Sequence, residues 1–231
     1  MAKPTVRYRK PAKKPGARGA KTVRRKNMKG PEREKAILDE AVRFFAENGF
    51  QGQTRELAKR AGIAQSAIFR HFPTKDALIE RVYEHVFISR WDTSWDSIII
   101  DETSDLQARL VRFYTEYAAR IFDYEWVRIF IHAGLREHSM TPRYLTLIEK
   151  KVIVPICVAI RKRKDPSPPA DKPISERERE AVWGLHGQIF YIAIRTFIYG
   201  IKMPSDRDTV IADHVRRFVR GELSTDLTAG A

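Results

Sequence analysis

One short stretch of the chain presents polar side chains at a spacing that suits reading the edges of DNA bases. The side chains at helical intervals on its outward face are Gln65, Ser66, Phe69 and Arg70. A glutamine amide can pair bidentately with adenine, and an arginine guanidinium reaches guanine or a phosphate. The stretch therefore predicts a short helix whose outward face fits a major groove.

The elements that must position this helix form a helix-turn-helix pattern over about residues 53–72. An amphipathic helix is expected from Pro31 to the Asn48-Gly49 stop, and a second from about Thr54, its expected cap, to Arg60. Ala58 is small enough for close contact between two helices, and Gly62 suits the left-handed turn between them. Any tight helical hairpin can contain such a glycine. The prediction therefore depends on the combined spacing of Ala58, Gly62 and the inward and outward residues of the following helix.

The segment ILDEAVRFFAENGFQGQTRELAKRAGIAQSAIFRHFPTKDALIERV resembles the DNA-binding domain of TetR-type (tetracycline-repressor-like) transcriptional regulators. Its most specific features are the Phe-x-x-Asn-Gly-Phe exit of the first helix, Ala61-Gly62-Ile63, and the run from Phe69 through Phe72-Pro73-Thr74-Lys75 to Leu78. The resemblance covers about residues 31–91. It implies a homodimer that represses transcription from a palindromic operator and is released by a small molecule. Repression is the family default rather than a deduction from these residues.

The resemblance also assigns contacts. It places the start of the second helix on phosphates and base edges, the start of the third on bases, and a lysine before the fourth on a phosphate. The sequence departs from the family pattern at Ala64, which replaces a capping hydroxyl, and at Phe69, which replaces a tyrosine. The candidate DNA-binding residues are Thr54, Arg55, Gln65, Ser66, Ala67, Phe69, Arg70, His71 and Lys75.

The charge of the chain is concentrated at its N-terminus. The net charge is +14, from 43 Lys and Arg against 29 Asp and Glu, and residues 1–30 hold 12 of the basic residues and no acidic one. We expect residues 1–30 to be a disordered basic arm, because they contain too little apolar surface to fold. The arm either contacts DNA phosphates or a minor groove, or acts only as a solubilising leader. A transit peptide fits less well, because serine is missing.

The predicted fold class is all-α, with a three-helix helix-turn-helix domain over 31–91, a helical effector-binding and dimerisation domain over 92–222, and a tail over 223–231. Helical patterns are expected at about 76–91, 106–122, 126–137, 144–162, 176–202 and 207–220. Ser175 and Glu178 have the spacing of a capping box. The helices at 176–202 and 207–220 are apolar over much of their surface, which predicts a homodimer through both, although a monomer core gives the same pattern.

The effector, if one exists, is not identified by the sequence. An aromatic chamber suits a hydrophobic ligand such as a fatty-acyl or aromatic compound, but bulky aromatics in helices also form plain cores that leave no chamber. The six histidines show no close pair, so no metal site is predicted, and no cofactor is expected. The candidate ligand-binding residues are Trp95, Phe113, Tyr117, Phe130, His132, Trp183, His186 and Phe190.

Other classes of protein fit the sequence less well. The chain has no GxSxG, glycine-rich phosphate loop, HExxH or paired CxxC, so no enzyme is predicted. Cys157 is the single cysteine, and no apolar run approaches the ~20 residues of a membrane span, so a cytoplasmic, nucleoid-associated protein without membrane partners is expected. The alternative is a non-specific or architectural DNA-binding protein dominated by its basic arm.

Overall fold

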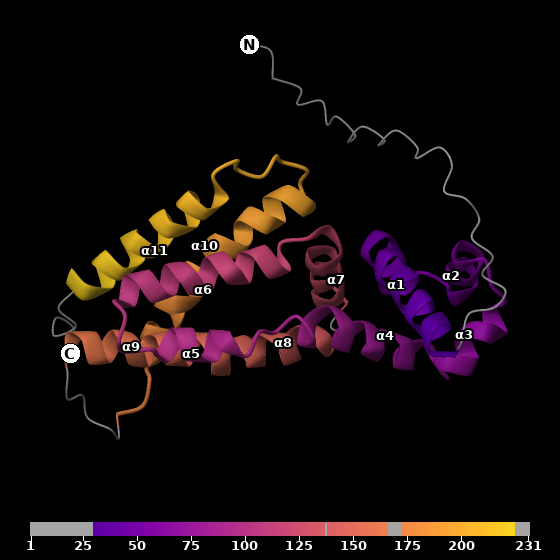
Figure 1. Ribbon diagram of the computed structural model, residues 1–231, viewed down its shortest axis with the longest axis horizontal. Helices are drawn as coiled ribbons and strands as arrows, with labels where there is room; N and C mark the ends of the chain where they lie inside the picture. The colour runs from indigo at the N-terminus through magenta and orange to yellow at the C-terminus, as the bar shows by residue number, and fades with distance from the viewer. Residues whose placement is uncertain (1–29, 137, 166–171, 225–231) are drawn as a thin grey trace, which may run out of the picture.

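The computed structural model describes residues 30–136, 138–165 and 172–224, and these residues form helices and connecting loops without a strand. The described molecule is elongated, with its N-terminal helices at one end (Figure 1). The arm predicted at 1–30 lies outside the described residues except for Gly30, and so does the predicted tail beyond Ser224.

The N-terminal helices form around α1 (Gly30–Asn48), whose apolar face is buried. A 3₁₀ turn, η2 (Gly49–Gln51), leads to α2 (Thr54–Ala61) and α3 (Gln65–His71). Gly49 has φ of +64°, so the Asn48-Gly49 stop acts as predicted. The Arg60 guanidinium of α2 donates hydrogen bonds to Glu40 at 3.0 Å and to Glu47 at 2.7 Å, both on α1, and these contacts fix the angle between the two helices.

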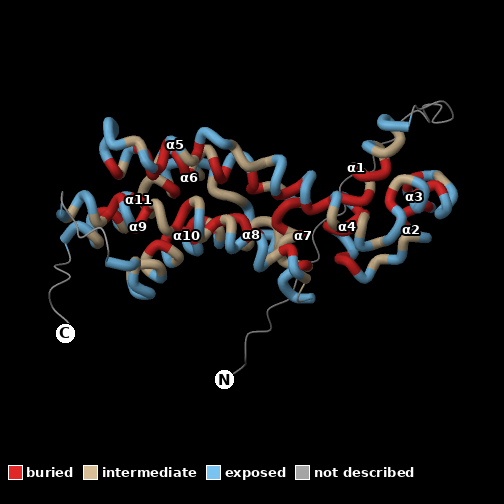
Figure 2. Tube along the Cα trace, turned by 90° about the horizontal axis from the view of Figure 1, so that it is seen from below, coloured by how far each residue is buried: buried red, intermediate tan, exposed pale blue. Residues whose placement is uncertain are grey.

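The fourth helix leads from the N-terminal helices into the rest of the molecule. α4 (Lys75–Tyr83) begins at Thr74, whose hydroxyl accepts the Ala77 N–H at 3.0 Å, as the sequence predicted. It runs on through one π-helical turn, η3 (Glu84–Ile88), and ends before Trp91. Because α4 packs on α1 and continues toward the C-terminal helices, it belongs to the core of both parts (Figure 2).

The C-terminal part contains α5 (Ser94–Ile100), α6 (Leu106–Ile121), α7 (Tyr124–Gly134), α8 (Met140–Ile148) and α9 (Val154–Lys164). A π turn, η4 (Glu149–Ile153), joins α8 to α9 just before Pro155. Proline cannot donate the backbone bond of a regular helix, and a wide turn accommodates that loss. The helix α5 was not predicted, because about two turns are too short to show a period.

The last two helices lie along one side of the molecule (Figure 1). α10 (Glu176–Phe197) starts with the predicted capping box, in which the Ser175 N–H donates to Glu178 at 2.8 Å and the Glu178 N–H donates back at 3.3 Å. α11 (Arg207–Ser224) packs on α6 and α10. The predicted ends at about 202 and 220 are wrong by a few residues, because α10 ends at Phe197, ahead of Gly200 with its φ of +72°, and α11 continues to Ser224. Within the described residues, no helix is long and apolar enough to cross a membrane.

Candidate nucleic-acid interface

The turn between α2 and α3 has the geometry that the sequence predicted. Gly62 adopts φ of +67°, and its N–H donates to the carbonyls of Ala58 and Lys59. Ala58 is buried where the helices meet, and the Ile63 N–H also reaches the Ala58 carbonyl at 3.1 Å. A left-handed glycine after α2 therefore turns the chain so that α3 crosses α2 at close contact.

The two faces of α3 divide sharply by burial. Ile68 and, just after the helix, Phe72 are in the core, whereas Gln65, Ser66 and Arg70 are exposed and Phe69 is 37% exposed. Four of the predicted contact residues therefore form one accessible face. Ala67 is buried at 6% exposure, so the prediction that it reads bases is wrong: its methyl group packs inward with Ile68.

The start of α3 is held to the start of α2 by a side-chain hydrogen bond. The Gln65 amide donates to the Thr54 hydroxyl at 2.8 Å. Thr54 does not cap α2, contrary to prediction, because Gln53 occupies the cap position and no side chain caps the helix. Ala64 likewise provides no cap to α3, as its methyl side chain predicted. A bidentate contact of Gln65 with adenine requires its amide to leave Thr54, whereas its carbonyl oxygen can accept without that change.

The remaining predicted contacts lie at the edges of the face. Arg55 is exposed, but the Lys75 ammonium donates to the Phe50 carbonyl at 2.5 Å and is half-buried. Lys75 thus anchors the loop between α1 and α2, and its remaining donors are those that a phosphate could use. His71 is half-buried, with Nδ1 3.9 Å from a carboxylate oxygen of Glu34.

Most of the residues predicted to bind an effector are packed against each other in the C-terminal part. Trp95 lies 5.4 Å from Tyr117 between ring centroids, and Phe130 lies 5.7 Å from Phe190. The hydroxyls of Tyr117 and Tyr144 are 3.0 Å apart and link the two halves of the group. We call the following set the aromatic cluster: Phe87, Trp95, Phe113, Tyr114, Tyr117, Trp126, Phe130, Tyr144, His186 and Phe190.

Several polar atoms of the aromatic cluster are buried without a hydrogen-bond partner among the described residues. They are the Tyr114 hydroxyl, the Trp126 indole N–H and Nδ1 of His186. Burial lowers the pKa of His186 to about 4, so its imidazole is neutral, and burial raises the pKa of Tyr114 and of Tyr117. Four members of the cluster were not predicted as ligand residues, although they lie on predicted helices: Phe87, Tyr114, Trp126 and Tyr144.

Two predicted ligand residues are not inside the aromatic cluster: His132 points away from it, and Trp183 only borders it through His186. His132 is on the side of α7 that faces α1, where a methyl group at Gly49 would come within 3.1 Å of its Nδ1. Burial there lowers the pKa of His132, and its assignment to the chamber is wrong because α7 turns that side toward the N-terminal helices. Trp183 lies at the rim, where its indole N–H donates to Glu149 at 2.8 Å.

The two parts of the molecule are joined by direct polar contacts. Arg143 of α8 bonds both carboxylate oxygens of Glu80 on α4 at 2.8 Å and lies 4.3 Å from the ring centroid of Tyr83. Arg128 of α7 donates to the carbonyl of Ala46, near the end of α1, at 2.7 Å. A shift of α7 or α8 therefore acts on both helices that carry α2 and α3.

The fold and the exposed face of α3 define a two-part, all-helical protein of the helix-turn-helix DNA-binding class. Residues 37–82 match the family described as bacterial regulatory proteins, tetR family. This stretch, which runs from α1 to α4, is thus similar to the DNA-binding domain of TetR-type transcriptional regulators.

Known proteins resemble the chain over different lengths. The nucleoid occlusion factor SlmA of Marinobacter nauticus is 35% identical over 85 residues, which cover 35% of this chain and 40% of that protein. A TetR-like regulator from Rhodococcus sp. RHA1 has a TM-score of 0.62 at 15% identity, over 84% of this chain and 100% of the other. A tetR-family regulator from Streptomyces coelicolor has a TM-score of 0.56 at 17% identity, over 88% and 93%. The family match thus covers α1 to α4 alone, and the structural likeness covers most of the chain.

Proposed function

We propose that the chain regulates transcription by binding a palindromic operator as a homodimer, and that it represses until a small molecule binds its C-terminal part. The observation that carries the proposal is the accessible face of α3, with Gln65, Ser66 and Arg70 exposed beside a well-packed turn. Two such helices about one DNA turn apart, ~34–36 Å, can enter successive major grooves.

The direct test is selection of bound duplexes from a random DNA pool at near-physiological salt. The wild type should enrich a palindrome, and Arg70→Ala should degrade its consensus at one position in each half-site. Arg112→Ala is the matched control, because Arg112 is an exposed arginine on α6 that pairs only with Glu116 within the described residues. No enrichment, with binding lost on deletion of residues 1–30, would replace this proposal by an architectural DNA-binding role.

Homodimerisation through α10 and α11 is supported by the open face of α10. Gly184 and Gly187 are exposed, and a methyl group at either would meet no atom within 4 Å. Tyr191, one turn further along the helix, is 49% exposed. Glycines beside an exposed aromatic ring let a second helix approach closely. Sedimentation velocity should show a dimer for the wild type and a monomer for Gly187→Trp; a dimer of unchanged affinity in both contradicts this arrangement.

An apolar effector is supported by the unpaired polar atoms inside the aromatic cluster. Buried donors without partners destabilise a fold, and a ligand with an acceptor group offers them hydrogen bonds. For release, the small molecule has to bind more tightly to a dimer whose two α3 helices are separated by a distance that does not fit the operator. Equal affinity for the fitting and the non-fitting dimer would not shift the equilibrium between them. The Arg143–Glu80 and Arg128–Ala46 contacts are the path by which such a change would reach α4 and α1.

The effector test is a screen of fatty-acyl and aromatic compounds for release of the selected operator. A compound that releases the operator should quench the fluorescence of Trp126 or Trp95. The substitution His186→Phe should weaken the binding of that compound. If no compound releases the operator and the cluster stays inaccessible to all of them, the aromatic cluster is only a core.

A further inference from the structure

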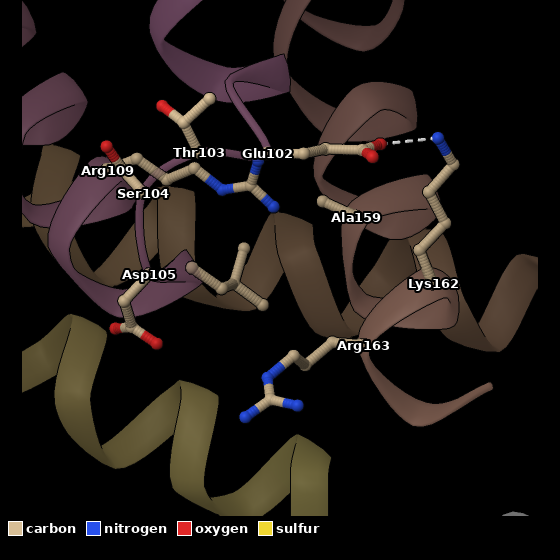
Figure 3. A pocket seen from close by; sticks show the side chains of 9 residues that line it. Glu102, Thr103, Ser104, Asp105, Arg109, Ala159, Lys162 and Arg163 are labelled. Atoms are coloured by element: carbon tan, nitrogen blue, oxygen red, sulfur yellow. Dashed lines mark hydrogen bonds and ion pairs between the residues drawn. The ribbon is translucent and has the colours of Figure 1, made fainter. Parts of the chain in front are cut away.

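A solvent-open hollow lies at the end of the molecule far from α3. It is bordered by the loop 101–105 before α6, by the first turn of α6 and by the end of α9, and its volume is about 370 Å³ (Figure 3). The cations on its lining are Arg109, Lys162 and Arg163. Neither the aromatic cluster nor the DNA-binding face contributes a residue to it.

Arg109 is the unusual member of this lining, because it is a charged side chain in the interior. It is 8% exposed, and its Nη1 donates to the Asp101 carbonyl at 2.7 Å. Its Nε is buried and makes no hydrogen bond within the described residues, among which the guanidinium forms no ion pair. A guanidinium offers five N–H donors, so most of the hydrogen-bonding capacity of Arg109 is unused. Figure 3 shows the guanidinium directed into the space between the loop and α9.

The carboxylates around the hollow are engaged by other groups. Glu102 pairs with Lys162 at 2.5 Å, and Asp105 accepts the N–H groups of Gln107 and Ala108 at the start of α6 at 3.0 and 3.3 Å. The Glu102 carboxylate is thus paired with a cation, and the Asp105 carboxylate accepts backbone hydrogen bonds.

Asp101 is engaged in the same way. It accepts from the Thr103 hydroxyl at 2.6 Å, and hydrogen bonds from Thr103 are the main cause of its lowered pKa, with the charge of Arg109 a lesser cause. The cations of the lining that form no ion pair in the described chain are Arg109, from inside, and Arg163, from the opposite side of the hollow.

We propose that this hollow binds the carboxylate or phosphate group of a small molecule, with the Arg109 guanidinium as its anchor and Arg163 as a second cation. A planar guanidinium matches the oxygens of either group bidentately, and a buried cation is stabilised by an anion that replaces water. The Ser104 hydroxyl, on the same lining, already donates to the Asp101 carboxylate at 3.2 Å, so the two arginines are the donors that the proposal uses. This proposal does not depend on DNA binding, so it can fail or succeed independently of the proposed function.

The test is isothermal titration of the full chain with inorganic phosphate and, separately, with acetate, at ionic strength held constant with chloride. At least one of the two should bind saturably, and the anion that binds more tightly identifies the group. Arg109→Gln should weaken binding roughly tenfold or more and Arg163→Gln severalfold, as expected when charge-assisted hydrogen bonds are lost. The Nε–Hε signal of Arg109 in a nitrogen–proton correlation spectrum should shift during the titration.

Two control variants locate the anion. Arg112→Gln removes the same charge from the exposed side of α6 and should leave binding unchanged. Arg70→Gln removes a cation of the DNA-binding face, and loss of binding in this variant alone would place the anion there and overturn the proposal. Absence of saturable binding by both probes would also overturn it. If circular dichroism shows that Arg109→Gln does not fold, the affinities of Arg163→Gln and Arg109→Lys for the anion are measured instead. An affinity equal to that of the wild type in both variants refutes the site.

Discussion

The buried imidazole of His186 makes the stability of the fold depend on pH. His186 lies between Tyr114, Tyr117 and Trp183, with ring centroids 5.6 to 5.9 Å away, and burial lowers its pKa from 6.5 to about 4. In the unfolded chain the imidazole takes up a proton below about pH 6.5, which the folded chain resists until about pH 4. Stability is therefore fully present above pH 6.5 and falls as the pH decreases from 6.5 to 4.

The size of the effect follows from the linkage relation. Each pKa unit corresponds to about 1.4 kcal/mol, so lowering the pH from about 7.5 to about 5 should cost about 2 kcal/mol of unfolding free energy from His186 alone. The whole shift, reached below pH 4, corresponds to about 3 kcal/mol.

The assay is guanidinium unfolding of the wild type and of His186→Phe at both pH values, at one fixed protein concentration because a dimer's stability depends on it. The wild type should lose about 2 kcal/mol more than His186→Phe between the two pH values. His85→Gln, a change at an exposed histidine on η3, should keep the wild-type dependence. An equal pH dependence of the wild type and His186→Phe would refute the reasoning, because it would mean that the imidazole is not held neutral by burial.

Other changes test the contacts that shape the DNA-binding end and its connection to the C-terminal part. Gly62→Ala should lower stability by about 1 kcal/mol, because φ of +67° strains any residue with a Cβ; unchanged thermal unfolding would contradict this conformation. Arg143→Gln should cost about 0.5–1 kcal/mol, since the pair is partly exposed, and a double-mutant cycle with Glu80→Gln should show coupling rather than additivity. Glu178→Gln should lower the unfolding free energy by about 1 kcal/mol at neutral pH. Hydrogen bonds from Arg161 lower the pKa of Glu178 to about 2, so the stabilisation by this carboxylate is present above about pH 4.5 and fades toward pH 2. The difference in stability between wild type and Glu178→Gln should therefore disappear over the same pH range. Equal acid unfolding of wild type and Glu178→Gln would disprove that contribution.

The elements that depend on neighbouring residues in the chain were predictable. The glycine turn at Gly62, the cap at Thr74 and the capping box at Ser175 each depend on backbone groups within a few residues, so the residue type and spacing suffice. The same holds for the inner and outer faces of α3, because a helical period fixes which side chains share a face. The short α5 was missed for the converse reason, since its few residues give no period to read.

The errors at the candidate site concern what a side chain meets in space. The family resemblance put Ala67 in the contact region, but packing of α3 buries it. Thr54 has a good capping side chain, yet the hydroxyl accepts from Gln65 on the next helix. His132 is on an aromatic-rich helix, but α7 is oriented with that residue toward α1.

The sequence alone therefore determined the all-helical class, the helix-turn-helix and its outward-facing residues, because those follow from local spacing, caps and turns. Only the tertiary structure decided that the aromatic residues pack against one another, that the two parts are joined through Arg143 and Arg128, and that Arg109 is buried beside a hollow without forming an ion pair in the described chain. The physical reason is that a helical period gives the direction of a side chain relative to its own helix axis. What meets that side chain depends on how helices distant in sequence are packed together, and no short-range pattern contains that information.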